Sequence, residues 1–271
     1  MDQLQKKYDS LVSEIKSLKS VAVAFSGGVD SVFLLHAAKE ALGEQVIAIT
    51  AVSATFPERE TNEARELCKN WNVRQKMVEF DEMSVEGFAQ NPPDRCYLCK
   101  YQLFTKICAV AKENGALEIL EGSNADDEKD YRPGLKAIAE LKVMSPLRKI
   151  GFTKQEIRTL LKQFGIETFK KPSFACLATR IPYGDLITTE KLKKIDAAEQ
   201  FLISKGFEGV RVRIHGELAR IEVVQEDIAR LCEPQLRNET VDFMKQLGFM
   251  YVTMDMNGYR QGSMNAPITG N

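Results

Sequence analysis

The chain has 271 residues, enough for one large domain or two ordinary ones, and its formal net charge of −1 argues against a global basic surface for nucleic acid. Six cysteines in a chain of this length do not make a disulfide scaffold. No apolar run is long enough to span a membrane, and the N-terminal residues lack the apolar core of a signal peptide, so we expect a cytoplasmic protein with reduced thiols.

The first elements in chain order are a helix, a strand and a glycine-rich turn. Apolar residues recur at steps of four and three over residues 2–18, which predicts an amphipathic helix. The apolar run at 21–25 predicts a buried strand, and the apolar pattern after residue 31 predicts a helix. Between them, residues 26–31 read Ser-Gly-Gly-Val-Asp-Ser. The sequence therefore predicts a strand, a tight turn and a helix in direct succession.

This turn carries the residue types of a phosphate-binding loop. Its backbone N–H groups lie at a helix N-terminus, which suits an anion. Gly27 and Gly28 can adopt positive φ and let the backbone approach a phosphate closely, and Ser26 and Ser31 add hydroxyl donors. Asp30 is an unusual residue for a phosphate cradle unless a cation lies there, so we predict that it binds Mg²⁺. No Gly-Lys-Ser or Gly-Lys-Thr follows, which excludes a Walker A loop.

The six residues SGGVDS resemble the PP-loop of the ATP pyrophosphatases. That family cleaves ATP between the α and β phosphates and adenylates a substrate. The alternative is an ordinary strand-to-helix turn, which rarely needs two glycines, two serines and an aspartate together. The resemblance implies that ATP and Mg²⁺ are used.

Strands and helices alternate along the following segments. Strands are expected at 46–51, 76–80 and 117–121, and helices at 57–71, 94–114 and, opened by a Thr-Lys-Gln-Glu capping box, 153–165. This alternation predicts the α/β class with a doubly wound parallel sheet.

Three polar segments follow predicted strands, at 26–31, 51–53 and 122–124. Ligands of doubly wound sheets bind at the carboxyl ends of the strands, so we expect the nucleotide there. The acidic run at 126–130 is typical of a solvated loop, but Arg132 ends it beyond a strand whose tip faces the nucleotide. The residues expected to bind ATP are Ala24, Ser26, Gly27, Gly28, Asp30, Ser31, Ala51, Gly122 and Arg132.

The pattern changes after a connection at 170–176 that contains a proline. Beyond it we expect, in order, a helix at 189–205, two alternating strands at 210–214 and 218–223 joined as a hairpin, a helical region broken at Pro234 and a strand at 249–256. We therefore expect a first domain at 1–170 and a second, smaller α+β domain at 171–271.

Three cysteines form a candidate metal site. Cys96 and Cys99 are a C-x-x-C pair near a helix start, where two thiols share a face. Two ordinary cysteines of one helix are the alternative. Cys176 lies in the proline-containing connection, outside any regular apolar pattern. Three thiolates leave one metal position open, whereas structural zinc sites usually close with four ligands, and they also suit a [4Fe–4S] cluster with one free iron. Cysteines within helical patterns are expected to be core or surface residues: Cys68, Cys108 and Cys232.

Two pairs of charged residues in the second domain allow two interpretations each. Arg211 and Arg213 alternate on one face of a strand, either as a solvent-facing stripe or as two guanidiniums that bind a phosphate or carboxylate. Glu199 and Glu222 are either surface acids or cation ligands.

With these residues identified, the whole chain resembles the LarE family, ATP-dependent sulfur transferases that build the nickel-pincer nucleotide cofactor of lactate racemase. The segments that carry the resemblance lie in both domains: 130–136, the Cys176 segment, 180–184, 210–215 and 251–265. The resemblance implies the substrate pyridinium-3,5-biscarboxylic acid mononucleotide. ATP would adenylate one carboxylate, pyrophosphate would leave, and sulfur would replace AMP to give a thiocarboxylate. The family resemblance also implies that the protein assembles as a homohexamer.

The family resemblance assigns roles to several residues. Some members have only the cysteine that matches Cys176, which attacks the acyl-adenylate and gives up its own sulfur. Others have three cysteines that hold a [4Fe–4S] cluster whose free iron carries an extra sulfide, and Cys96, Cys99 and Cys176 match this type. Asp30 and Cys176 are the implied catalytic residues. The remaining matches are Arg180, Arg211 and Arg213 for the substrate, and Glu199 and Glu222 for a cation.

Three other functions stay open from the sequence. An amide-forming ATP pyrophosphatase needs ammonia and has no use for three thiols. A tRNA thiolase also combines a PP-loop with three cysteines, but it requires a basic surface, against which the net charge of −1 argues. In a non-enzymatic nucleotide-binding regulator, Asp30 and the thiols would have no task. We expect a small-molecule nucleotide as the partner, with neither membrane nor nucleic acid.

Overall fold

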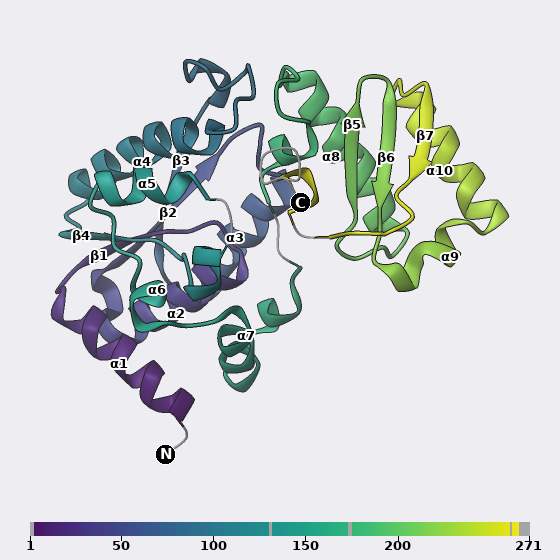
Figure 1. Cartoon of the computed structure of the whole chain (residues 1–271). Coiled ribbons are helices and arrows are strands. Elements are labelled where there is room, and N and C mark those ends of the chain that lie inside the picture. The colour runs from purple at the N-terminus through teal and green to yellow at the C-terminus, as the bar shows by residue number, and fades with distance from the viewer. Residues whose placement is uncertain (1–2, 130–131, 173–174, 261, 266–271) are drawn as a thin grey trace. The chain divides into compact units, whose positions relative to one another are not determined.

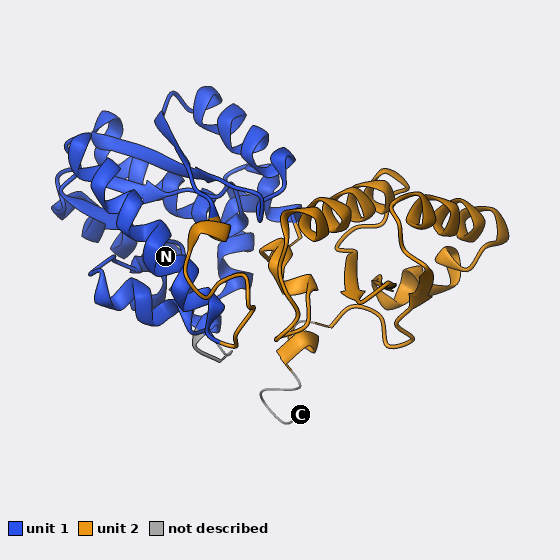
Figure 2. Cartoon of the chain, turned by 90° about the horizontal axis from the view of Figure 1, so that it is seen from above, with its two compact units in different colours: residues 1–81, 94–171 blue, residues 82–93, 172–271 orange. Residues whose placement is uncertain are grey.

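The chain divides into two units in the computed structural model, which describes residues 3–129, 132–172, 175–260 and 262–265. Unit 1 comprises residues 1–81 and 94–171, and unit 2 comprises residues 82–93 and 172–271 (Figure 2). The described helices include none that is both long enough and apolar enough to cross a membrane.

A four-stranded parallel sheet forms the centre of unit 1, with the strand order β3-β2-β1-β4. Its strands are β1 (Val21–Ala24), β2 (Val46–Val52), β3 (Arg74–Glu79) and β4 (Glu118–Leu120). The chain passes from β1 to β2 and β3 on one side, then returns to β4 on the other side of β1. This reversal creates a switch point at the carboxyl ends of β1 and β4, where sheets of this kind bind ligands.

Helices cover both faces of this sheet, which confirms the predicted doubly wound α/β class (Figure 1). In the figure, α4 and α5 lie above the sheet, and α1, α2, α6 and α7 lie below it. The helices of unit 1 are α1 (Gln3–Ser17), α2 (Val29–Leu42), α3 (Glu58–Asn70), α4 (Arg95–Glu113), α5 (Gly134–Glu140), α6 (Pro146–Ile150) and α7 (Lys154–Gln163). The short helices α5 and α6 carry no clear periodicity and were not expected from the sequence.

The core of unit 1 lies around α2, which is apolar on most sides. Val32, Phe33, Leu34 and Leu35 are consecutive and all fully buried, as expected for a helix enclosed by other elements. Helix α1 covers it with its predicted apolar stripe, and α7 packs beside it. Because α2 is held on several sides, the loop that precedes it has a rigid base.

Unit 2 is a three-stranded mixed sheet with helices, in the order β5-β6-β7. The predicted hairpin is present: β5 (Arg211–His215) and β6 (Leu218–Glu222) pair antiparallel. The last strand, β7 (Tyr251–Met254), pairs parallel to β6. The helices are α8 (Thr189–Ser204), α9 (Ile228–Leu231) and α10 (Pro234–Gln246), and Pro234 occupies the first turn of α10.

Residues 82–93 belong to unit 2 although unit 1 surrounds them in sequence. Asn91 is fully buried there, and its side-chain amide donates hydrogen bonds to the carbonyls of Ile181 at 3.2 Å and Pro182 at 2.6 Å. The backbone N–H of Gly184 donates to the Asn91 carbonyl. This excursion of the chain was not expected from the sequence, because hydrogen bonds between distant segments leave no local pattern.

Candidate active site

The loop between β1 and α2 is the glycine-rich turn that the sequence predicts to bind phosphate. Gly27 has φ of 74°, which favours glycine, whereas Gly28 has φ of −77° and caps α2, so only the first glycine uses the positive φ open to both. A Cβ on Gly27 would lie 3.2 Å from the Cβ of Ala64 in α3. The hydroxyls of Ser26 and Ser31 lie 3.2 Å apart. The loop therefore needs its first glycine for both conformation and space.

The carboxyl end of β4 closely approaches this loop. A Cβ on Gly122 would lie 3.1 Å from the backbone nitrogen of Ser31 and 3.3 Å from the Cβ of Asp30. The first N–H groups of α2 have no acceptor within the helix and suit a bound anion. Ala24 is the last residue of β1, and Ala51 lies near the same end of β2. The structure thus brings together the predicted nucleotide-binding segments of unit 1.

Asp30 is held by two side chains of unit 1. The Nζ of Lys154 lies 2.5 Å from Oδ2, and the side-chain amide of Asn124 donates to Oδ1 at 3.2 Å. The side-chain oxygen Oδ1 of Asn124 accepts a hydrogen bond from the backbone N–H of Asp126. The capping box at Thr153 is confirmed, but it gave no indication that the lysine after it reaches Asp30.

The acidic segment after β4 is part of this arrangement. Asp127 is only 8% exposed, so the solvated-loop interpretation is wrong for this residue. Its carboxylate accepts a hydrogen bond from the backbone N–H of Asn124 and lies 2.9 Å from a guanidinium nitrogen of Arg132. Asp126 accepts from the backbone N–H of Lys154 at 2.9 Å. These bonds fix the segment beside the loop.

A second lysine that the sequence did not single out lies on the other side of the loop. The Nζ of Lys171 lies 2.6 Å from Glu60 and 2.6 Å from Glu63, both on α3. It also donates to the Gly27 carbonyl at 3.4 Å. Because Lys171 is the last residue of unit 1, this contact joins the loop to the connection that leads to Cys176.

The three predicted metal-ligating cysteines come from both units. Cys96 and Cys99 lie in the first part of α4, as predicted, and both are half-buried. Cys176 belongs to unit 2, is half-buried, and directly precedes a 3₁₀ helix at Leu177–Arg180. Among the residues that the structure describes, no three His, Cys, Asp or Glu side chains gather as a metal site. The iron–sulfur cluster therefore stays a prediction.

The other cysteines are core or surface residues, as expected. Cys68 is buried in α3, and burial raises the pKa of its thiol to about 12. Cys108 is half-buried in α4, and burial likewise raises the pKa of its thiol. Cys232 follows α9 and is exposed.

A buried cluster of arginines and glutamates lies in unit 2. Arg180 and Glu199 form a bidentate pair, with Nε–Oε1 at 2.8 Å and Nη2–Oε2 at 2.9 Å. Glu222 pairs with Arg213 at 2.8 Å and with Arg220 at 3.0 Å. Both glutamates are fully buried, so the surface-acid interpretation is wrong.

Arg211 and Arg213 are buried as well, only 2% and 4% exposed. The solvent-facing stripe is therefore wrong, because residues 211–214 of β5 are covered on both faces. The Arg211 guanidinium lies 5.0 Å from the ring centroid of Tyr259, and burial together with the charge of Arg180 lowers its pKa. The Nε of Arg213 is buried without a hydrogen-bond partner. Arg220 also lies 3.8 Å from Asp255, so four arginines face three carboxylates, and buried guanidiniums of this kind suit an anion.

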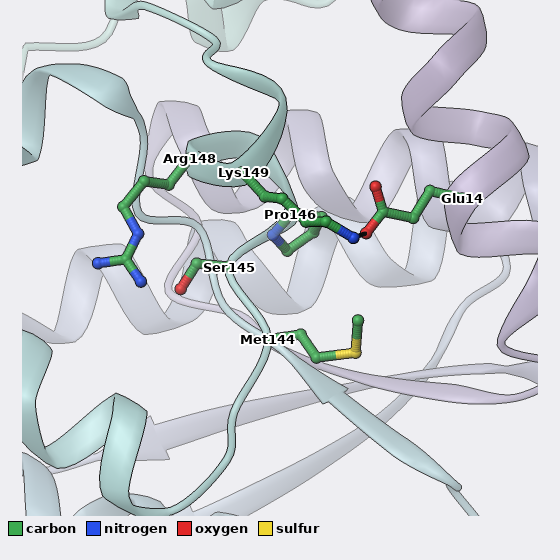
Figure 3. A pocket seen from close by; sticks show the side chains of 6 residues that line it. All are labelled: Glu14, Met144, Ser145, Pro146, Arg148 and Lys149. Carbon is green, nitrogen blue, oxygen red and sulfur yellow. Dashed lines mark hydrogen bonds and ion pairs between the residues drawn. The ribbon is translucent and has the colours of Figure 1, made fainter.

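Two surface hollows are lined by residues other than those of the PP-loop. The first, of about 430 Å³, is lined by residues of α1, α6 and the segment before α6 (Figure 3). Lys149 and Glu14 point toward one another across it and form an ion pair at 2.8 Å. The second, of about 410 Å³, is lined by residues of unit 2 that include Tyr259 and Arg260. Neither contains a residue predicted to bind ATP.

Comparison with known proteins agrees with this geometry. The PP-loop domain family matches residues 1–177. The parallel sheet, the glycine loop at the β1–α2 junction and this match define a PP-loop ATP-binding enzyme.

The chain is 36% identical over 271 residues to the pyridinium-3,5-bisthiocarboxylic acid mononucleotide synthase of Lactiplantibacillus plantarum. The alignment covers 99% of this chain and 97% of that synthase. It belongs to the LarE family of ATP-dependent sulfurtransferases, as the sequence had indicated. An uncharacterised protein of Synechocystis is 35% identical over 266 residues, covering 98% of this chain and 99% of that protein. A tRNA-specific 2-thiouridylase of Lawsonia intracellularis is 28% identical over 179 residues, and this alignment covers only 55% of this chain and 50% of the thiouridylase.

Proposed function

We propose that this enzyme adenylates a carboxylate of pyridinium-3,5-biscarboxylic acid mononucleotide and converts it to a thiocarboxylate for the nickel-pincer nucleotide. The observation that carries the proposal is the match to the synthase along nearly the whole of both chains. A match restricted to the PP-loop domain would support only ATP binding, whereas this one includes unit 2 with its buried arginines.

The proposed reaction has two displacements. A carboxylate oxygen of the substrate attacks the α-phosphorus of ATP, and pyrophosphate leaves. A sulfur nucleophile then attacks the acyl carbon, and AMP leaves with the former carboxylate oxygen. The first step is needed because a carboxylate is a poor electrophile, and adenylation gives it a good leaving group.

Unit 1 supplies the groups for the adenylation step. The first N–H groups of α2 and the hydroxyls of Ser26 and Ser31 would bind the phosphates. Asp30 offers the oxygen ligands that Mg²⁺ prefers, and the Asn124 side-chain N–H groups orient its carboxylate. Mg²⁺ in nucleotide sites needs only one or two carboxylates besides phosphates and water. When bound, Mg²⁺ would neutralise charge on the departing pyrophosphate.

Unit 2 supplies the groups that would bind the substrate's own phosphate. Arg211 and Arg213 are already desolvated, so an anion that reaches them meets guanidiniums in a low-dielectric surrounding, where charge-assisted hydrogen bonds are strong. Arg180 is fixed by Glu199 and adds to the positive potential. In this proposal Glu199 and Glu222 position the arginines, with a cation role as the alternative.

The thiols would provide the sulfur. Three thiolates are a suitable ligand set for a [4Fe–4S] cluster with one open iron, so we propose Cys96, Cys99 and Cys176 as its ligands. When bound, the cluster would supply a sulfide as the nucleophile. The alternative is that Cys176 donates its own sulfur.

Pyrophosphate release tests the proposal. The purified protein is given Mg²⁺ and ATP with the biscarboxylate mononucleotide, with bulk tRNA, or with neither. We expect release that requires the mononucleotide, and a product in which mass spectrometry finds one oxygen replaced by sulfur. Release that requires tRNA would favour a tRNA thiolase, and ATP binding without release under any condition would favour a nucleotide-binding regulator.

A further inference from the structure

Lys154 forms an ion pair with Asp30, the residue that the sequence predicts to bind Mg²⁺. Its Nζ lies 2.5 Å from Oδ2 of Asp30, while Oδ1 accepts from Asn124. Both charged side chains are only about a quarter exposed, 28% for Lys154 and 24% for Asp30. An ammonium at this oxygen takes one of its lone pairs and repels a Mg²⁺ ion that approaches the same carboxylate. The loop therefore contains a built-in competitor for the cation.

The backbone of Lys154 is fixed, whereas its side chain has room to move. Its backbone N–H donates to the Asp126 carboxylate at 2.9 Å, and the capping box of Thr153 and Glu156 sets the start of α7 directly before it. The side chain has a flexible four-carbon stem and partial access to solvent. The ammonium can therefore leave Asp30 without any rearrangement of the helix.

We propose that Lys154 is an exchangeable cation of the active site and a catalytic residue for adenylation. In the nucleotide-free enzyme it neutralises Asp30. With Mg–ATP bound, Asp30 would hold the cation, and the freed Lys154 ammonium would bind the β and γ phosphates, whose dense negative charge attracts it. It then stabilises the charge that develops on the departing pyrophosphate. The proposal rests on the proposed function in one respect, because it requires that the loop bind Mg–ATP.

An inert ion pair is the competing explanation. Exposed ion pairs contribute little and respond to nothing but salt. The Lys149–Glu14 pair, at 2.8 Å and with Lys149 largely exposed, is of that kind and includes no residue of the loop, which makes it a matched control. The two explanations predict different affinities for a divalent cation when Lys154 is replaced.

Binding of Mn²⁺ to the nucleotide-free protein tests the first half of the proposal. Titration followed by electron paramagnetic resonance needs no reaction and therefore does not depend on the proposed function. We expect Lys154→Met to raise the Mn²⁺ affinity about tenfold, since a competing charge is removed from a partly buried carboxylate. The gain should disappear in the double variant Asp30→Asn/Lys154→Met. Lys149→Met should bind Mn²⁺ as the wild type does.

Adenylation kinetics test the second half. We expect Lys154→Met to lower kcat for Mg–ATP-dependent pyrophosphate release about 10²-fold, the effect of losing one preorganised group at a developing charge. KM for ATP should change much less, and Lys154→Arg should restore part of kcat because it keeps the charge. Circular dichroism and unfolding of each variant establish that it is folded.

Each outcome decides the proposal. Higher Mn²⁺ affinity with lower kcat supports it. Unchanged Mn²⁺ affinity, or a gain that persists without the Asp30 carboxylate, overturns the exchange. Wild-type kcat in folded Lys154→Met overturns the catalytic role. If the wild type releases no pyrophosphate with any substrate, the proposed function fails, and the Mn²⁺ result still decides the exchange.

Discussion

Arg180 and Glu199 form a fully buried, bidentate ion pair, with nitrogen–oxygen distances of 2.8 and 2.9 Å. Glu199 also accepts a hydrogen bond from the backbone N–H of Val212 at 3.0 Å. One carboxylate thus links the 3₁₀ helix before Ile181, helix α8 and strand β5. The pair positions the strand that carries Arg211 and Arg213.

Removal of Glu199 should be costly for stability. Glu199→Ala leaves Arg180 buried without its counter-ion, so we expect unfolding by urea to show a loss of about 3–5 kcal/mol. Glu239→Ala is the control, because it breaks the exposed Lys205–Glu239 pair, at 2.7 Å, on the same unit. A Glu199→Ala protein as stable as Glu239→Ala would mean that the buried pair does not hold unit 2 together.

Removal of Asp30 should abolish adenylation. Asp30→Ala deletes the proposed Mg²⁺ ligand but no apolar core contact, so the protein should fold, and pyrophosphate release should fall by about 10²-fold or more. The measurement is an initial-rate assay over a range of Mg²⁺ concentrations, with circular dichroism as the check on folding. Near-normal release from the folded variant would contradict the assignment of Asp30 to the cation.

Replacement of Arg211 or Arg213 should weaken binding of the substrate more than binding of ATP. Arg211→Ala and Arg213→Ala are each expected to weaken binding of the biscarboxylate mononucleotide roughly ten- to hundredfold, as for lost charge-assisted hydrogen bonds. Arg211→Lys should restore only part of the mononucleotide affinity that Arg211→Ala loses, since the point charge of an ammonium replaces a planar guanidinium. Calorimetry with each ligand makes the comparison. Unchanged mononucleotide affinity in both alanine variants would leave these arginines a structural role only.

If Cys96, Cys99 and Cys176 hold a [4Fe–4S] cluster, the protein should contain iron and sulfide. After anaerobic purification, iron and acid-labile sulfide should be present in the wild type and lost in Cys96→Ala, Cys99→Ala and Cys176→Ala. Cys232→Ala is the control, because Cys232 is exposed and has no proposed role. A different result would be activity in both Cys96→Ala and Cys99→Ala together with loss of one sulfur from Cys176 per turnover. That result would make Cys176 a sacrificial donor.

The sequence by itself determined the features that depend on neighbouring residues. The apolar run, the SGGVDS turn and the apolar helix at 21–38 are consecutive, so their order alone places a phosphate cradle at a strand–helix junction. The alternation of strands and helices determined the class of sheet, and the C-x-x-C spacing placed Cys96 and Cys99 in the first part of α4. Periodicity and capping act within one element, and a sequence displays them directly.

Only the tertiary structure decided which side chains meet. Lys154 reaches Asp30 from 124 residues away, and nothing in either segment specifies the other. The alternation at Arg211 and Arg213 is typical of an exposed face, yet the strand is covered on both faces because α8 and the 3₁₀ helix at Leu177–Arg180 pack against it. Burial and ion pairing are properties of what the rest of the chain brings to a residue. For that reason the loop could be predicted from its own residues, whereas the contact of Lys154 with Asp30 and the buried arginine cluster could not.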